Sequence, residues 1–303
     1  MKGALTFVVR EGDGATARDV LAKVGGLARA AADEGRAFVG GRRLTPDEPL
    51  APGDEVEVHA ARAAPSLAVT ILASKKGLVV ADKPAGLPTT ADRRGSASLL
   101  DAIASMRGVD VATLHAGSRL DVGVSGAVLV ATTTRATKAL ADAREAGEVH
   151  RLYVALAAGE LDGEGAWDAP IGEARAPGGR SLPAAHGHRE RKAVTRWRAV
   201  ARAPGVTLLA LTPVTGRSHQ LRVHAALAGL PLLGDRDHGG PRQLALAGGK
   251  VVPCGDRVAL HALRVEVASL DVAAESPVPD AMRALWSAVG GDPAAWAALE
   301  PPR

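Results

Sequence analysis

The feature that most constrains the fold of this chain is a succession of short apolar runs that begins near residue 69. The runs alternate with turn residues, which is typical of β-strands. They are VTILASKKGLVVADKP, GAVLVATT, LYVALAAGEL, VTLLALTPV and VALHALRVEV. Two segments have helical spacing instead: residues 133–148, ending at Gly147, and RSHQLRVHAALAGL, ending at Gly229. We therefore expect strands and helices over residues 69–303.

The first sixty residues have a different character. Helical spacing in TARDVLAKVGG is broken by Gly25 and Gly26, and RRLTPDEPLAPGDEVEVH indicates short strands around a Pro-Gly-Asp turn. The segment ARAAPSLA, residues 61–68, resembles a linker. We expect a small domain at 1–60, a linker at 61–68 and a second domain at 69–303, as the length of 303 residues favours at about 150 residues per domain.

Composition and charge narrow the class of protein. Hydrophobic residues make up 47% of the chain and aromatic residues 2%, so alanine, valine and leucine must fill its core. The formal charge of +4 and the pI of about 9.5 suit a nucleic-acid partner, although many proteins without such a partner are equally basic.

Cys254 is the only cysteine, so no internal disulfide is possible and a reducing compartment is favoured. The first residues lack the apolar core and the cleavage site of a signal peptide, and the sequence has no apolar run of about 18 residues. We expect a cytoplasmic monomer with no membrane association.

Three enzyme classes find little support. GVSG at 123–126 approaches the G-x-S-x-G pattern of serine hydrolases, but Ala127 stands where glycine is required. His186 and His188 lie in a basic, Gly/Pro-rich loop, and His219 and His224 are poorly spaced for one helix face, so we expect no metal site. No phosphate-binding glycine motif occurs. The basic loop, residues 172–192, is either a solvated hairpin tip or an RNA contact.

Four other segments contain the residues that could carry chemistry. They are VVADKPAGLPTT (79–90), GSRLDVGVSGAVLVATT (117–133) with Arg119 and Asp121, HRLYVALAAGEL (150–161) with the only tyrosine, Tyr153, and TPVTGRSHQLRVHAALAGLPLLGD (212–235) with Arg217, Gln220 and Arg222. Taken singly, these residues are explained equally well without any function: Asp121 as an aspartate in a turn and Arg217 as a surface charge.

Taken together and in this order, the segments resemble the RluA-type pseudouridine synthases. That family's pattern runs Lys-Pro-Ala-Gly, then His-Arg-Leu-Asp-x-x-Thr-Ser-Gly, a strand tyrosine, Thr-Gly-Arg-x-His-Gln-Ile-Arg-Val-His and Pro-x-x-Gly-Asp. It closes with Leu-His-Ala, matched here at 260–262. The resemblance covers about residues 70–285. Residues 16–58 resemble the small RNA-binding module of ribosomal protein S-four.

The resemblance implies an α+β fold, a mixed and mainly antiparallel sheet with flanking helices and a central cleft. It implies that the protein isomerises specific uridines of structured RNA, with ribosomal RNA favoured over transfer RNA. The reaction detaches uracil, turns it and rejoins it through carbon, so no cofactor is needed.

The resemblance also assigns catalytic roles. Asp121 is the catalytic carboxylate, either a nucleophile at the anomeric carbon or a base on the neighbouring sugar proton. Tyr153 offers uracil a flat face and a hydroxyl that could assist proton removal. Arg217 is expected beside Asp121, keeping it ionised.

The expected RNA contacts come from both domains. Arg119 is expected to fill the space that a flipped uridine leaves or to hold the RNA backbone. The further expected contacts are His219, Gln220 and Arg222 in the fourth segment and Arg42 and Arg43 near the N-terminus.

Three departures from the family pattern matter for function. Ser118 replaces the histidine before Arg-Leu-Asp, Val124 replaces threonine, and His238 replaces the tyrosine that follows Gly-Asp. A catalytically silent RNA-binding or ribosome-assembly protein on the same fold is therefore an alternative. The presence of Asp121, Tyr153 and Arg217 favours the enzyme.

Overall fold

A computed structural model describes residues 5–29, 31–33, 36–59, 68–91, 96–175, 181–185 and 187–302. The chain divides into two compact units, one of Met1–Ala68 with Leu87–Val111 and one of Val69–Gly86 with Ala112–Arg303. The linker predicted at 61–68 lies, except for Ala68, outside the described residues.

The first unit contains a four-stranded antiparallel sheet. Its strand order is β1 (Leu5–Val8), β4 (Glu55–Val58), β2 (Ala37–Val39) and β3 (Arg42–Arg43). Helix α1 (Ala17–Val24) begins with a capping box between Thr16 and Asp19, and η1 (Gly26–Ala28) follows it. Gly25, with φ of 73°, ends α1 because a left-handed φ is accessible to glycine at little cost. The first unit has its own hydrophobic core, which is made of buried residues in the range Val9 to Val58.

Helix α2 (Leu99–Arg107) also belongs to the first unit. Ser98 caps it in a second capping box with Asp101, and Gly108 ends it in the left-handed conformation. None of its residues belongs to the core between Val9 and Val58.

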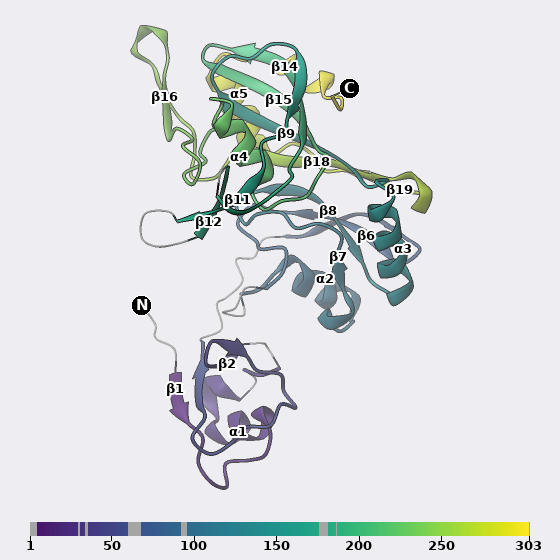
Figure 1. The fold of residues 1–303 in the computed structure, drawn as a ribbon, viewed down its shortest axis with the longest axis vertical. Coiled ribbons are helices and arrows are strands. Elements are labelled where there is room, and N and C mark those ends of the chain that lie inside the picture. The colour runs from purple at the N-terminus through teal and green to yellow at the C-terminus, as the bar shows by residue number, and fades with distance from the viewer. Residues whose placement is uncertain are drawn as a thin grey trace. The chain divides into compact units, whose positions relative to one another are not determined.

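The second unit is built on a ten-stranded sheet (Figure 1). The order is β10 (Glu164–Trp167), β14 (Thr195–Ala203), β15 (Val206–Pro213), β9 (His150–Ala158), β18 (Leu260–Val267), β8 (Ser125–Ala131), β6 (Leu78–Lys83) and β5 (Thr70–Lys75), with β19 (Val272–Glu275) beside β18 and β7 (His115–Ala116) beside β8. Every pairing is antiparallel except β8 with β18. The expected mixed, mainly antiparallel α+β fold is confirmed.

Smaller elements complete the second unit. A three-stranded sheet has the order β12 (Ser181–Ala185), β11 (Ile171–Arg175), β13 (His188–Arg191), and β16 (Gln243–Ala245) pairs with β17 (Val251–Pro253). The α-helices are α3 (Thr134–Glu145), α4 (Gln220–Leu227) and α5 (Asp280–Ala288). Short 3-10 helices, labelled η, are η2 (Val111–Thr113), η3 (Ala247–Gly249), η4 (Ala268–Leu270) and η5 (Pro293–Ala298). The first residue of η2, Val111, belongs to the first unit. No helix in the described ranges is long and apolar enough to cross a membrane.

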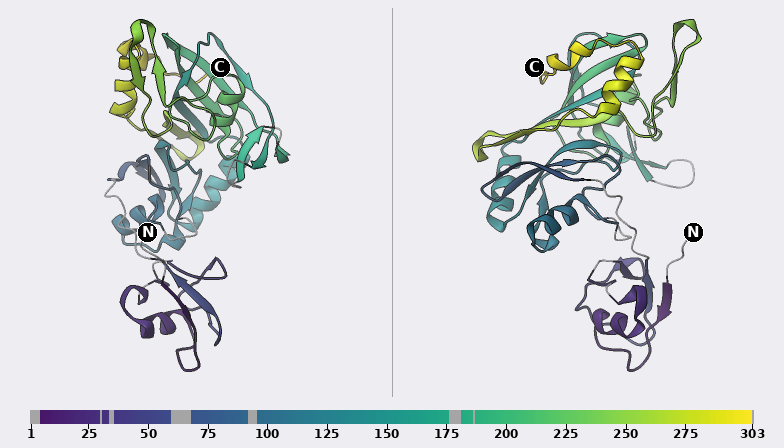
Figure 2. Two further views of the ribbon diagram at one scale, coloured as in Figure 1. Left: turned by 90° about the vertical axis from the view of Figure 1, so that its left-hand side faces the viewer. Right: turned by 180° about the vertical axis from the view of Figure 1, so that it is seen from behind.

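The two faces of the large sheet are used differently. Helix α5, yellow in Figure 2, covers one face, where Trp286 packs with Val154 and Leu156 of β9. Helix α4 lies against β14 and β15 (Figure 1). Since successive strand residues point to opposite faces, Tyr153 points away from the face that holds Val154.

One row of directly paired residues crosses seven strands of this sheet. It runs Gly165, Trp197, Leu211, Tyr153, Ala262, Gly126 and Lys83. Directly paired residues project from the same face of a sheet. Lys83 and Tyr153 therefore share a face although they lie on strands three positions apart in the sheet.

Gly126 makes the parallel pairing of β8 with β18 possible. Its φ is 117°, and a Cβ placed on it would lie 2.2 Å from the carbonyl oxygen of Ala262. Only glycine accepts both the close approach and this backbone conformation. This pairing brings the segment that precedes β8 next to β18 near the middle of the sheet.

Candidate active site

Asp121 lies in a tight turn just before β8, and its side chain is 27% exposed. The amide of Val124 donates to the Asp121 carbonyl at 3.0 Å, which closes the turn. The amide of Gly86, in the Lys-Pro-Ala-Gly segment, donates to the carbonyl of Val122 at 2.6 Å. The backbone that carries Asp121 is thus held from both sides.

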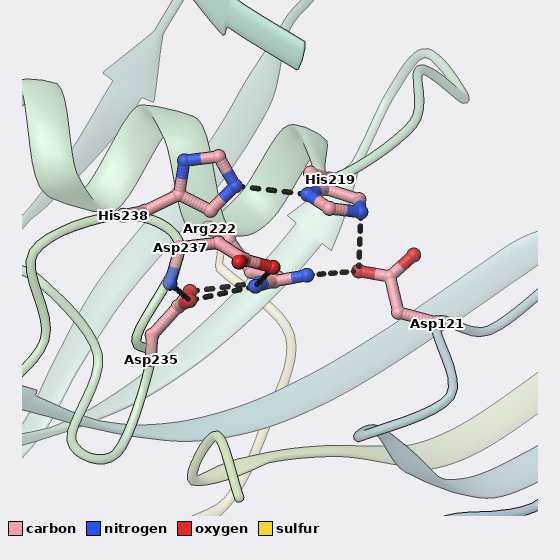
Figure 3. Close-up of polar contacts among 6 residues, drawn as sticks. All are labelled: Asp121, His219, Arg222, Asp235, Asp237 and His238. Atoms are coloured by element: carbon pink, nitrogen blue, oxygen red, sulfur yellow. Dashed lines mark hydrogen bonds and ion pairs between the residues drawn. The ribbon is translucent and has the colours of Figure 1, made fainter. Parts of the chain in front are cut away.

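Arg222, in the first turn of α4, points its guanidinium at the Asp121 carboxylate (Figure 3). Its Nη1 donates to Oδ2 of Asp121 at 2.9 Å. Its Nε and Nη2 donate to the two carboxylate oxygens of Asp235 at 2.7 and 2.6 Å, and Nη2 also donates to Asp237 at 3.1 Å. The planar guanidinium group allows this bidentate ion pair, which fixes the direction in which Nη1 points.

Burial disfavours the charged form of Arg222, but the hydrogen bonds and charges of Asp235 and Asp121 outweigh it and raise the pKa of the guanidinium. The Asp235 side chain is 0% exposed and that of Arg222 8%. Arg222 is therefore a permanent, buried cation beside Oδ2 of Asp121.

The expectation that Arg217 lies beside Asp121 is wrong. Arg217 precedes α4, and its Nε donates to the carbonyl of Lys192 at 3.0 Å. The helix begins only at Gln220, so Arg222 and not Arg217 lies on the turn that approaches Asp121.

Two of the residues expected to contact RNA are buried in the structure. Arg222 is buried and occupied by three carboxylates. Gln220 is 4% exposed, and its amide makes all four of its hydrogen bonds inside the protein. The four partners are Thr215 Oγ1, the Arg217 amide, the Val194 carbonyl and Thr195 Oγ1.

His219 does reach the site. It precedes α4 in a left-handed conformation with φ of 54°, and its Nε2 lies 3.8 Å from Oδ2 of Asp121. Its Nδ1 lies 2.9 Å from Nε2 of His238, with the two rings edge to face (Figure 3). The sequence signal for His238 is its departure from the family pattern, which bears on substrate choice and on activity but does not indicate a contact with His219.

Burial lowers the pKa of both histidines, that of His238 to about 4, against the opposing effect of the nearby carboxylates. Both imidazoles are therefore uncharged near pH 7. An uncharged histidine has one N–H and one nitrogen without a proton. The ring that donates in the hydrogen bond between the two histidines therefore determines which nitrogen of the other ring carries its proton.

Tyr153 and Lys83 lie on the sheet face beside Asp121. Burial raises the pKa of the Tyr153 hydroxyl, the positive charge of Arg151 opposes the rise, and the Asp121 charge adds to it. Lys83 is 0% exposed, and burial lowers its pKa to about 8, although the Asp121 charge acts in the opposite direction. We had not predicted a role for Lys83, which the Lys-Pro-Ala-Gly motif could have indicated.

The remaining expected RNA contacts lie at the surface. Arg119 is exposed, two residues before Asp121. Arg42 is exposed and forms an ion pair with Glu48. The side chain of Arg43 lies outside the described part of the chain, as do residues 176–180 and His186 of the basic loop.

The serine and histidine near the site form no hydrolase centre. Ser125 Oγ lies 2.8 Å from Nδ1 of His261, whose Nε2 lies 3.2 Å from the carbonyl of Ser276. Ser125 is 9% exposed and His261 1%, so the pair belongs to the sheet interior. In the described ranges, no group of three or more histidine, cysteine or acidic side chains could hold a metal ion.

The arrangement leaves one carboxylate oxygen ready to react. Arg222 and His219 both face Oδ2 of Asp121, while no described residue donates a hydrogen bond to Oδ1. A carboxylate held in this way can attack an electron-poor carbon or remove a proton.

Comparison with known proteins supports one family. Residues 77–227 match the family model described as RNA pseudouridylate synthase. An uncharacterized RNA pseudouridine synthase of Zymomonas mobilis is 36% identical over 224 residues, 72% of this chain and 97% of that protein. Ribosomal large subunit pseudouridine synthase D of Xanthomonas campestris is 34% identical over 284 residues, 88% and 84% of the two chains. The structure of human RNA pseudouridylate synthase domain containing 4 shares the fold, with a TM-score of 0.56 and 22% identity over 77% of this chain and 94% of that one.

Proposed function

Since this chain belongs to the RNA pseudouridylate synthase family and is an isomerase acting on RNA, we propose that it converts a uridine of large-subunit ribosomal RNA and that Asp121 carries the reaction. The choice of RNA is supported by the relative from Xanthomonas campestris, whose name refers to the large ribosomal subunit.

The observation that carries the proposal is that the two oxygens of the Asp121 carboxylate have different surroundings. Oδ2 accepts from the buried Arg222 at 2.9 Å, which holds the group in place. Oδ1 remains for the ribose of the target uridine. A rigid, pre-aligned carboxylate avoids much of the entropy cost of bringing reacting groups together.

Tyr153 is proposed to contact the uracil ring while the base is detached and turned. It lies on the same sheet face as Lys83, and Asp121 is close enough to affect its pKa. The target base must leave its stack to reach this site, at a cost of a few kcal/mol. Arg119 is proposed to offset that cost by contacting the RNA where the base was stacked, and its exposure supports this.

The N-terminal unit is proposed to add RNA affinity. It has its own sheet and its own core, and Arg29 and Arg42 are exposed on it. Phosphate contacts of such residues supply affinity that does not depend on sequence.

The proposal is tested by incubating the purified protein with unmodified transcripts of large-subunit ribosomal RNA and of transfer RNA, and mapping pseudouridine at each position. We expect modification of a specific uridine in the ribosomal transcript. Asp121→Asn should abolish it with RNA affinity nearly unchanged, because phosphate contacts and stacking carry binding.

The matched control is Asp142→Asn, which removes an exposed carboxylate of α3 paired with Lys138. It should retain full activity. If Asp121→Asn kept a tenth of the wild-type rate, the assignment of Asp121 would be wrong. If the wild type modified only transfer RNA, the proposed target would be wrong, and a wild type that bound RNA without modifying it would indicate the silent RNA-binding alternative.

A further inference from the structure

The two histidines beside Asp121 form a chain of contacts that the isomerisation proposed above does not use. His238 Nε2 lies 2.9 Å from His219 Nδ1, and His219 Nε2 lies 3.8 Å from Asp121 Oδ2. Figure 3 shows the three side chains in that order. The His219 side chain is 19% exposed, so water competes little for these contacts.

A hydrogen bond between two imidazole nitrogens requires one proton between them. If His238 supplies it, the His219 Nδ1 is the acceptor and the proton of His219 is on Nε2, facing Asp121. If His219 supplies it, a bare Nε2 lone pair faces the carboxylate. The first arrangement is favoured because an N–H dipole attracts the anion and a lone pair repels it.

The charged groups around the pair favour the same arrangement. Asp121 faces it from the turn before β8, Arg222 from α4, and Asp235 and Asp237 from the segment that follows α4. Arg222 donates to all three carboxylates, and His219 Nε2 lies 3.8 Å from the same Asp121 oxygen that accepts from Arg222.

The backbone conformation of His219 also indicates that the surrounding structure holds this residue in place. A φ of 54° is uncommon for a residue other than glycine and costs free energy, so it persists where surrounding structure holds it. This conformation presents the His219 ring to both Asp121 and His238 immediately before α4.

We propose that His238 is a positioning residue that acts through His219. It donates to Nδ1 of His219 and so fixes the Nε2–H of His219 toward Oδ2 of Asp121, which leaves Oδ1 for the substrate. The kinetic part of this inference rests on the proposed role of Asp121. The hydrogen-bond direction does not, and it can be measured in the free protein.

The first test is the tautomer of His219, read from long-range ¹H–¹⁵N spectra of protein labelled at histidine, with the signal assigned through His219→Gln. We expect the Nε2–H form in the wild type near pH 7.5. In His238→Phe the donor is lost and an aromatic ring is kept, so a mixture of tautomers should appear. His238→Tyr should restore the Nε2–H form because a phenol O–H can donate to Nδ1.

The second test is single-turnover isomerisation at saturating RNA with the same variants. We expect His238→Phe to lower the rate constant about 10- to 100-fold through misplacement of the carboxylate, with RNA affinity unchanged. His238→Tyr should recover most of the rate. His150→Phe, at an exposed histidine at the start of β9, should have no effect on either readout.

Three results would overturn the proposal: an Nδ1–H tautomer of His219 in the wild type, a wild-type rate constant for His238→Phe, or a folded His238→Tyr as slow as His238→Phe. If His238→Phe does not fold, the His219 tautomer of the wild type and the tautomer and rate constant of His238→Tyr still test the proposal. A wild type that shows the Nε2–H form but modifies no RNA would contradict the proposed function and leave the hydrogen-bond direction established.

Discussion

At the scale of single residues, the site depends on a buried cation that serves two purposes. Arg222 balances the buried charge of Asp235 and points its last donor at Asp121. A buried ion pair adds little net stability, but removing one partner leaves an uncompensated charge that is costly. Stability and activity can therefore be separated by changing both partners.

We expect Arg222→Met to lower the free energy of unfolding by about 3–5 kcal/mol and to abolish activity, because the buried charge of Asp235 loses its cation. Adding Asp235→Asn should restore much of the stability and none of the activity. Urea denaturation and the isomerisation assay measure the two effects. Arg202→Met, which breaks an exposed pair with Asp162, is the control and should change stability by less than about 1 kcal/mol. Recovered activity in the double variant would show that Arg222 acts only on the fold.

Lys83 gives the stability of the protein a specific pH dependence. Its pKa falls from 10.5 in the unfolded chain to about 8 in the folded one because burial disfavours the charge. Between these two values the unfolded chain binds a proton that the folded chain has released, so this contribution to stability rises with pH. Below pH 8 the full penalty, about 3 kcal/mol, is present.

Lys83→Met removes that penalty. We expect the variant to be more stable than the wild type at pH 7, by up to about 3 kcal/mol, and the difference to shrink as pH rises toward 10.5. Denaturation of both proteins at several pH values measures it. A difference that stays constant from pH 7 to pH 10 would contradict a buried ammonium at this position.

The residues of the site were only partly predictable from the sequence. Asp121 and Tyr153 belong to motifs whose spacing along one segment fixes their local position. The partner of Asp121 was misassigned because Arg217 and Arg222 are both arginines of one motif, and only the start of α4 at Gln220 decides which one faces Asp121. The His219–His238 contact depends on the path of the chain after α4, which no local pattern specifies.

At the scale of elements, the site depends on the parallel pairing of β8 with β18. This pairing joins His261 to Ser125 and Ala262 to Gly126, immediately after the Asp121 turn. Apolar runs predicted the strands and helical spacing predicted α3 and α4. The position of β18 between β8 and β9 was not predictable, since apolar periodicity says nothing of which strands become neighbours.

Gly126→Ala tests the importance of that pairing. The new Cβ would meet the Ala262 backbone in a conformation that alanine rarely adopts, so we expect a loss of about 3 kcal/mol or more of unfolding free energy. Gly123→Ala is the matched control, because its Cβ would meet only Val258 at an ordinary 3.6 Å. Thermal and urea denaturation compare them, and equal stabilities would mean that the two strands can separate without cost.

At the scale of the whole molecule, the first unit adds fewer available cations than its sequence suggests. Arg18 pairs with Asp33 and Asp47, Lys23 with Asp13, and Arg42 with Glu48. Such pairs must open before these side chains can contact phosphate. The contribution of this unit to RNA binding should therefore be smaller than a count of its lysines and arginines would give.

Deleting residues 1–64 should leave a folded catalytic unit, because the core between Val9 and Val58 includes no residue of the large sheet. We expect weaker RNA binding and a shallower salt dependence, with each lost phosphate contact flattening the log–log slope by about 0.7–0.9. Binding isotherms from 50 to roughly 200 mM salt measure the slope. An unchanged slope would show that the first unit has a role other than binding RNA.

The central position of β18 also determines when the enzyme can first work during its own synthesis. β8 ends at Ala131 and β18 begins at Leu260, so about 130 residues, or roughly 6 to 26 s of translation at about 5–20 residues per second, separate two strands that must lie side by side. Until β18 emerges from the ribosome, β8 and β9 each lack a neighbour and expose an unpaired edge. Nascent chains therefore pass through an aggregation-prone interval in which the Asp121 turn exists but β8, which follows it, still lacks its β18 neighbour, and slower translation lengthens that interval.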